Sequence, residues 1–249
     1  MIDESFHIPV LTEEVIQYLS VKSDGNYLDA TAGFGGHSTA IIEQLVNGSL
    51  VATDQDPEAI SYLKLKFKSE KRISIQQARF SELDKLFSAK DFDGILADIG
   101  VSSYQLNTAE RGFSFMKDGP LDMRMNQNIG EDASSWLSKA SENEISSIVW
   151  KYGEEKKAKR IAKAIIESRK NFKIETTKEL AEIILEAVPR RYNDKKHPAT
   201  KTFQAIRIFI NNELHELKSL LDFTTKHLRI GGRVCIISFH SLEDRMVKQ

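Results

Sequence analysis

Two aspartates that end apolar runs are the residues of this sequence best placed to do chemistry. Asp54 closes the run 49–53, about 20 residues after a glycine-rich turn, and an acid at that distance can accept a hydrogen bond from a ribose hydroxyl. Its structural alternative is a helix N-cap or a turn acid before Pro57. Asp98 closes the run 94–97. A carboxylate at the end of a buried strand must be paired or functional.

The glycine-rich turn contains Gly33, Gly35 and Gly36, which allow positive φ and let a ligand approach the backbone. It lacks the Lys-Ser or Lys-Thr of a P-loop and the third glycine of GxGxxG, so it does not favour a pyrophosphate. Asp29 opens the turn instead. Its carboxylate would repel pyrophosphate but attract a cation, such as the amino group and sulfonium of S-adenosylmethionine. This favours methyl transfer over hydride transfer, although a plain turn between two core elements also explains the glycines.

Strand and helix patterns alternate around these residues. Apolar runs typical of strands occupy 26–30, 49–54, 73–76 and 94–99, and helical patterns occupy 8–19, 38–45 and 57–67. The alternation predicts a doubly wound parallel α/β sheet. Phe80 follows the third strand on the same rim as the glycine turn, where it either flanks an adenine ring or packs in the core.

The pattern changes from about residue 109, where a long charged and aromatic loop of the kind that forms lids or binding elements begins. Helical patterns follow at 133–140, 142–150, 154–169, 177–187 and 203–217. No strand pattern occurs between 109 and 228, and the sheet resumes at 231–239. We therefore predict a core of residues 1–108 and 214–249, with an all-helical insertion of residues 109–213 between strands 4 and 5.

Composition excludes several kinds of site. Cys235 is the single cysteine, which excludes an intramolecular disulfide and a thiolate metal cluster. His7, His37, His197 and His240 are far apart in sequence, so a structural role is the default for each, and we predict no metal site. The start carries no basic region before an apolar run, and no segment reaches the length of a membrane span. We therefore expect a cytoplasmic protein with no membrane partner.

Charge is spread unevenly along the chain. Residues 151–201 hold 15 Lys and Arg against 8 Asp and Glu, although the whole chain has a net charge of −1. Clustered Lys and Arg can bind the phosphates of RNA or DNA. A solvated helix face gives the same composition.

At the family level, the sequence resembles the bacterial 16S ribosomal RNA (cytidine-N4)-methyltransferases over essentially the whole chain. The resemblance is carried by the blocks 7–14, 29–38, 54–57, 98–105, 110–125, 152–155, 197–213 and 238–248. The most specific stretches read AERGFSF at 109–115 and FHSLEDR at 239–245. Members of this family continue well past the second stretch, so we expect the last strands of their sheet to be absent from these 249 residues.

The resemblance implies methylation of the exocyclic amine of a decoding-centre cytidine in 16S rRNA. We expect this RNA to be met within the small ribosomal subunit, with naked rRNA as the alternative substrate. It implies S-adenosylmethionine as cofactor and a class I, Rossmann-like methyltransferase core. Matching motif positions imply these cofactor-binding residues: Gly35, Gly36, His37, Asp54, Phe80, Asp98 and Gln105. An open sheet edge would favour association, so we expect a monomer or a homodimer.

For catalysis we expect Asp98, with Ser102 and Ser103 nearby, to accept hydrogen bonds from the amine of an unstacked cytidine. Phe113 or Phe115 would stack on that base or pack in the core. Candidate phosphate contacts are Arg111, Arg124, Lys201, Arg207 and Arg245. The alternative functions are a NAD-dependent oxidoreductase that uses the same turn and a catalytically silent RNA-binding or assembly factor.

Overall fold

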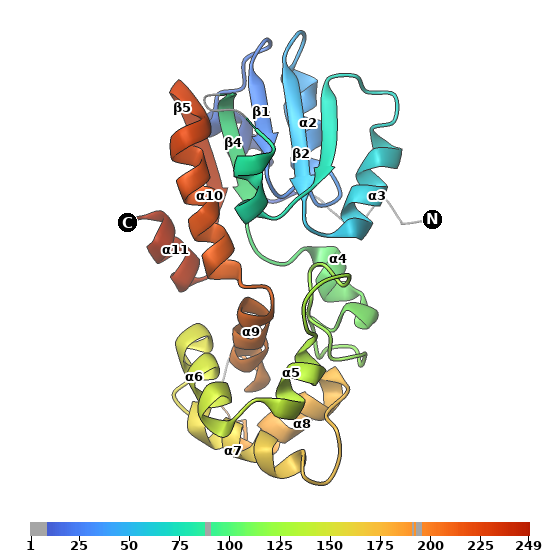
Figure 1. Ribbon diagram of the computed structural model, residues 1–249, viewed down its shortest axis with the longest axis vertical. Helices are drawn as coiled ribbons and strands as arrows, with labels where there is room; N and C mark the ends of the chain where they lie inside the picture. Colours follow the sequence, from blue (N-terminus) through green and yellow to red (C-terminus); the bar gives the residue numbers. More distant parts are fainter. Residues whose placement is uncertain (1–8, 88–90, 191, 193–195) are drawn as a thin grey trace. The chain divides into compact units, whose positions relative to one another are not determined.

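The computed structural model describes residues 9–87, 91–190, 192 and 196–249, so His7 lies outside the described residues. The chain divides into two compact units, which Figure 1 shows in ribbon form. The first unit comprises residues 1–100 and 214–249, and the second comprises residues 101–213. The role of the second unit in substrate recognition stays a prediction.

A parallel sheet forms the centre of the first unit. Its strands follow the order β3-β2-β1-β4-β5, and every neighbouring pair is parallel. The strands are β1 (Asn26–Asp29), β2 (Ser49–Asp54), β3 (Ile73–Gln77), β4 (Phe92–Asp98) and β5 (Leu228–Ile237). The predicted α/β fold with a parallel sheet is therefore confirmed, and the carboxyl ends of β1, β2 and β4 carry Asp29, Asp54 and Asp98.

Helices cover the two faces of this sheet because successive strand side chains point to opposite sides. Leu28 of β1 packs in a cluster with Leu220 and Phe223, whereas Tyr27 packs with Val15 and Ile41. The helical elements of the first unit are α1 (Thr12–Leu19), α2 (Gly36–Gln44), α3 (Pro57–Lys66), η2 (Phe80–Lys85), α10 (Glu213–His227) and α11 (Ser241–Val247). The strand ends are thereby fixed between α10 on one face and α1 and α2 on the other.

The second unit has its own apolar core. Trp136, Ile145, Ile161, Ile184 and Phe203, from five different helices, belong to one buried cluster. The elements are α4 (Ser103–Asn107), η3 (Ala109–Arg111), α5 (Ala133–Lys139), α6 (Glu142–Gly153), α7 (Ala158–Ser168), α8 (Thr177–Ala187) and α9 (Ala199–Ile210). Helix α6 packs against α7 and α9, and α7 packs against α8.

Two of the predicted helices differ from the observed ones. The pattern at 203–217 spans a break between α9 and α10, where Asn212 is left-handed with φ of 52°, and another helix begins four residues later than predicted. The sequence pattern predicts a helix from 154, but α7 begins at Ala158 because Glu154 is left-handed, with φ of 49°. Gly153 ends α6 at a close approach, since a Cβ there would lie 2.5 Å from the carbonyl oxygen of Lys201. Packing against α9 therefore sets the end of α6.

Within the described part of the chain, no helix is both long and apolar enough to cross a membrane.

Candidate functional site

Asp29 ties the glycine-rich turn to the start of α2. Its side chain is fully buried. One carboxylate oxygen accepts a hydrogen bond from Ser38 Oγ at 2.6 Å, and the other accepts one from the Thr31 backbone N–H at 3.3 Å. Burial raises the pKa of Asp29, and the hydrogen bond from Ser38 opposes that rise. The carboxylate therefore supports the turn that the sequence assigns to a ligand.

Gly33 and Gly35 both adopt positive φ, at 50° and 77°. Gly35 is the N-cap of α2, and a Cβ there would lie 2.8 Å from side-chain carbons of both Leu63 and Phe67. Gly35 therefore meets a packing requirement of α3 as well as a conformational one. Gly36 lies at the first position of α2.

Asp54 holds the turn from the end of β2. Its Oδ2 accepts a hydrogen bond from Gly33 N–H at 2.8 Å, and its Oδ1 accepts one from Asp56 N–H at 2.9 Å. Burial is the largest cause that raises the pKa of Asp54, to about 6, and the charges of Asp56 and Asp29 add to it. The N-cap of α3 is Asp56, which accepts a hydrogen bond from Glu58 N–H. The N-cap alternative for Asp54 is therefore wrong, whereas a turn-stabilising role is present.

Asp98 and His37 face each other at the end of β4. His37 Nε2 lies 3.6 Å from Asp98 Oδ2, and the His37 side chain is 6% exposed. Among the described residues, neither ring nitrogen of His37 nor Asp98 Oδ1 has a hydrogen-bond partner. Buried polar atoms are normally paired, so these atoms are suited to a polar ligand. The backbone N–H of Asp98 donates to Thr31 Oγ1, which fixes this end of β4 against the turn.

Phe80 begins η2 and packs, partly buried, against the cluster that contains Leu28 and Phe223. The next residue is held by an acid that sequence reasoning missed. Glu216, on α10, is buried and accepts hydrogen bonds from both the N–H and the Oγ of Ser81, each at 2.9 Å. The sequence signal for the burial of Glu216 is its place directly before Leu217, which lies on the apolar stripe of a helix. Glu216 therefore fixes the segment that carries Phe80.

Ser102, Ser103 and Gln105 belong to the second unit. Ser102 is the N-cap of α4, and its Oγ accepts a hydrogen bond from Gln105 N–H at 3.2 Å. In return, Gln105 Oε1 accepts one from Ser102 N–H at 3.0 Å. These side chains form a capping box, and Ser103 is the first residue of the helix. Their roles in binding and catalysis stay predictions.

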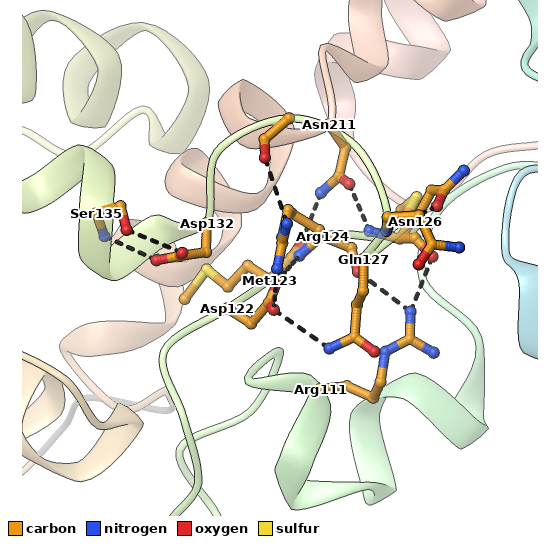
Figure 2. A network of polar contacts seen from close by, with 12 residues as sticks. Arg111, Asp122, Met123, Arg124, Asn126, Gln127, Asp132, Ser135 and Asn211 are labelled. Carbon is orange, nitrogen blue, oxygen red and sulfur yellow. Dashed lines mark hydrogen bonds and ion pairs between the residues drawn. The ribbon is translucent and has the colours of Figure 1, made fainter.

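The irregular loop after η3 is held by buried polar side chains, which Figure 2 shows from close by. Arg111 is 2% exposed and donates to the carbonyl oxygens of Arg124 and Met125. Asn211 donates to Met123 O and accepts from Met125 N–H, each at 2.7 Å. Met123 lies between these contacts with φ of 65°, a conformation rare for a residue other than glycine. The loop is therefore a rigid element.

These contacts correct several candidates for phosphate binding. The Arg111 guanidinium is buried on carbonyl oxygens, so it offers no surface contact. Arg124 makes two hydrogen bonds to Asp122, and Arg207 makes two to Glu213. Lys201 is exposed, and its Nζ donates to the carbonyl oxygen of Glu154.

The two phenylalanines proposed for base stacking lie in or against the core of the second unit. Phe113 is 5% exposed, and Phe115 packs edge-on against Phe203.

Comparison with known proteins gives matches over nearly the whole chain. The profile of the MraW methylase family matches residues 4–249. A protein of Coxiella burnetii (strain Dugway 5J108-111), described as ribosomal RNA small subunit methyltransferase H, is 50% identical over 248 residues, which cover 98% of this chain and 80% of that protein. One of the same description from Stenotrophomonas maltophilia (strain K279a) is 49% identical over 245 residues, with coverages of 98% and 76%. The solved structure of TrmN from Thermus thermophilus matches at 19% identity, covering 40% of this chain and 30% of that chain with a TM-score of 0.35.

Proposed function

The chain belongs to the MraW methylase family, and we propose that it methylates the exocyclic N4 amine of a decoding-centre cytidine in 16S rRNA. Methylation of small-subunit ribosomal RNA is supported by the description of relatives that are about 50% identical over nearly the whole chain. The finer target rests on the resemblance of the stretches 109–115 and 239–245. We place this activity in the cytoplasm, with the small ribosomal subunit as the form in which the RNA is met.

The side chains at the strand ends fit S-adenosylmethionine as the methyl donor. When bound, this cofactor supplies a methyl group activated by a sulfonium. Asp54, which accepts a hydrogen bond from Gly33 N–H, would also accept hydrogen bonds from ribose hydroxyls, and Gly35, Gly36 and His37 would form the turn around the cofactor. The acids at the ends of three neighbouring strands create a negative potential that favours a cationic ligand. The observation that carries the proposal is the facing pair of His37 and Asp98, whose buried polar atoms have no hydrogen-bond partner among the described residues.

Asp98 is the residue we assign to the acceptor amine. The lone pair of a cytidine amine is delocalised into the ring, so its orientation toward the methyl group has a large effect on the rate. We propose that Asp98 would accept a hydrogen bond from this amine and take its proton, while the C–N bond forms and the bond from the methyl carbon to sulfur breaks to leave a neutral thioether. Ser102 and Ser103 follow Asp98 closely in the chain and would help to hold the base. The base must leave its stack to reach this position, at a cost of roughly a few kcal/mol.

Two alternatives remain to be compared with this proposal. The oxidoreductase is set aside because the whole-chain family match is to a methylase. A catalytically silent RNA-binding factor would bind both rRNA and cofactor but would transfer no methyl group. Single-turnover methylation separates that factor from the enzyme.

The test replaces Asp98 by Asn and by Ala, with Glu43→Gln on the exposed surface of α2 as the control. Methyl transfer to small subunits is measured with labelled cofactor, the product is located by mass spectrometry, and cofactor binding is measured separately by calorimetry. We expect turnover to fall by about 10²-fold or more in both Asp98 variants, as for loss of a group that handles a proton. Near-normal turnover would remove Asp98 from the mechanism. Absence of any methyl transfer by the unchanged chain in a single turnover, with cofactor bound, would favour the silent factor.

A further inference from the structure

Helix α7 separates apolar and basic residues onto two faces. Ala158, Ile161, Ala162 and Ile165 are buried in the core of the second unit. The basic residues Lys159, Arg160 and Lys163 are exposed, as is Lys156 just before the helix. With 3.6 residues per turn, positions 159, 160 and 163 fall within an arc of about 100° on the outer face. The four cations are named here the α7 basic face.

The cations of the α7 basic face make no direct contact with an acid among the described residues, although Lys170 and, more weakly, Lys163 lower the pKa of Glu167 on the same helix. Within the part of the chain that the structure describes, none of these four side chains forms an ion pair or a hydrogen bond. Other exposed lysines of the same unit are paired, namely Lys139 with Glu131, Lys170 with Glu167 and Lys173 with Glu175, at 2.7–2.8 Å. The four cations have no directly bonded acid among the described residues, so they give this part of the helix surface an excess of positive charge.

A phosphate backbone fits this surface better than the other common polyanion, an anionic lipid membrane. A basic amphipathic helix binds a membrane by inserting its apolar face below the headgroups. The apolar face of α7 is buried against α6 and α8, so it is not available for insertion. Phosphate contacts need only exposed cations. In addition, the arginines of the second unit that the sequence offered for phosphate binding, Arg111, Arg124 and Arg207, are already bound to carbonyl oxygens or acids.

We propose that the α7 basic face binds the phosphate backbone of the rRNA substrate. This inference rests on the proposed function and extends it. It assigns the docking of the RNA to a helix that carries none of the predicted catalytic residues. Contacts to phosphate fix the position and orientation of the nucleic acid and carry no sequence information. The surface therefore contributes affinity, whereas the choice of the target cytidine depends on other residues.

The test reverses three charges together, in the variant Lys159→Glu/Arg160→Glu/Lys163→Glu. The matched control is Lys139→Glu/Lys173→Glu/Lys178→Glu, which makes the same change in net charge on exposed lysines of the same unit. Dissociation constants for small-subunit rRNA are measured at several salt concentrations, and thermal unfolding checks that both variants are folded. A second variant, Lys159→Gln/Arg160→Gln/Lys163→Gln, removes the cations without adding negative charge.

We expect the α7 variant to bind rRNA at least tenfold more weakly than the control variant. The slope of log K against log salt should fall by about 2 to 3, since each lost phosphate contact removes about 0.7–0.9. KM for the RNA should rise while cofactor affinity stays unchanged. The proposal would be overturned if the two triple variants lost the same amount of rRNA affinity, or if the salt slope stayed unchanged. It would also be overturned if the α7 variant lost binding to anionic vesicles that the control variant kept. RNA binding is measured without turnover, so a failure of methylation would be recognised separately.

Discussion

Protonation of Asp54 is expected to control both stability and cofactor binding. Burial raises the pKa of this carboxyl to about 6 from its ordinary value of 3.8. Between these two values the native chain holds a proton that the unfolded chain has released. The favourable contribution is therefore complete below about pH 3.8 and is lost as the pH rises through 6. Over this interval of about two pH units, the loss in the free energy of unfolding amounts to about 3 kcal/mol.

The variant Asp54→Asn removes this titration. It also replaces one carboxylate oxygen by an NH₂ group, so the hydrogen bond from Gly33 N–H or from Asp56 N–H is lost. The stability lost with that hydrogen bond does not depend on pH. We therefore expect the difference in the free energy of unfolding between the unchanged chain and Asp54→Asn to shift by about 2 kcal/mol between pH 4.5 and pH 7. Urea unfolding at each pH measures it, with Glu43→Gln, an exposed acid on α2, as the control. A difference that stays constant across this range would refute the reasoning.

Cofactor binding provides a second measurement on the same group. A ribose hydroxyl donates its hydrogen bond to the ionised carboxylate, and a pKa of about 6 leaves about a tenth of the chains ionised at pH 5. The affinity for S-adenosylmethionine should therefore be about tenfold lower at pH 5 than at pH 7. In Asp54→Asn the affinity should be low at both pH values and change little between them. A pH dependence that persists in this variant would assign the titration to another group.

Two further predictions concern buried polar side chains. Glu216→Ala should lower the free energy of unfolding by about 2 kcal/mol, because Ser81 loses two hydrogen bonds to a charged group. It should also raise KM for the cofactor several-fold with little change in kcat, because Glu216 fixes the segment that carries Phe80. Ser81→Ala, which removes only the hydroxyl, should show a smaller effect, and steady-state kinetics that place the whole loss in kcat would contradict a positioning role. Asn211→Ala should lower the free energy of unfolding, measured with urea, by about 3 kcal/mol. The reason is that it leaves buried backbone groups of the loop unpaired. Asn128→Ala on the exposed part of that loop should cost little, and equal costs would show that the contacts of Asn211 are not distinctive.

Residues that act through local patterns were predictable from the sequence. The alternation of strands and helices gave the parallel sheet, because period and turn signals are properties of short segments. The same patterns located Asp54 and Asp98 at strand ends. The ligand turn was recognisable because its glycines and Asp29 are adjacent in the chain.

Contacts between distant segments were not predictable in this way. Glu216 meets Ser81 across 135 residues, and no local pattern links them. The burial of Arg111 was missed because an arginine in a charged loop gives no signal that carbonyl oxygens will enclose it. The start of α7 was misplaced because the end of α6 depends on the approach of α9 at Gly153. Tertiary packing decides each of these cases.

The space around Gly35 also limits how this protein can change during evolution. A mutation to alanine would meet two independent obstacles, a collision with Leu63 and Phe67 and a backbone at φ of 77° that costs an ordinary residue about 1–2 kcal/mol. A suppressor mutation in or beside α3 that trims one of these side chains would remove only the collision. Such a second-site change would therefore leave the backbone cost of about 1–2 kcal/mol in place, and only reversion to glycine removes both obstacles at once.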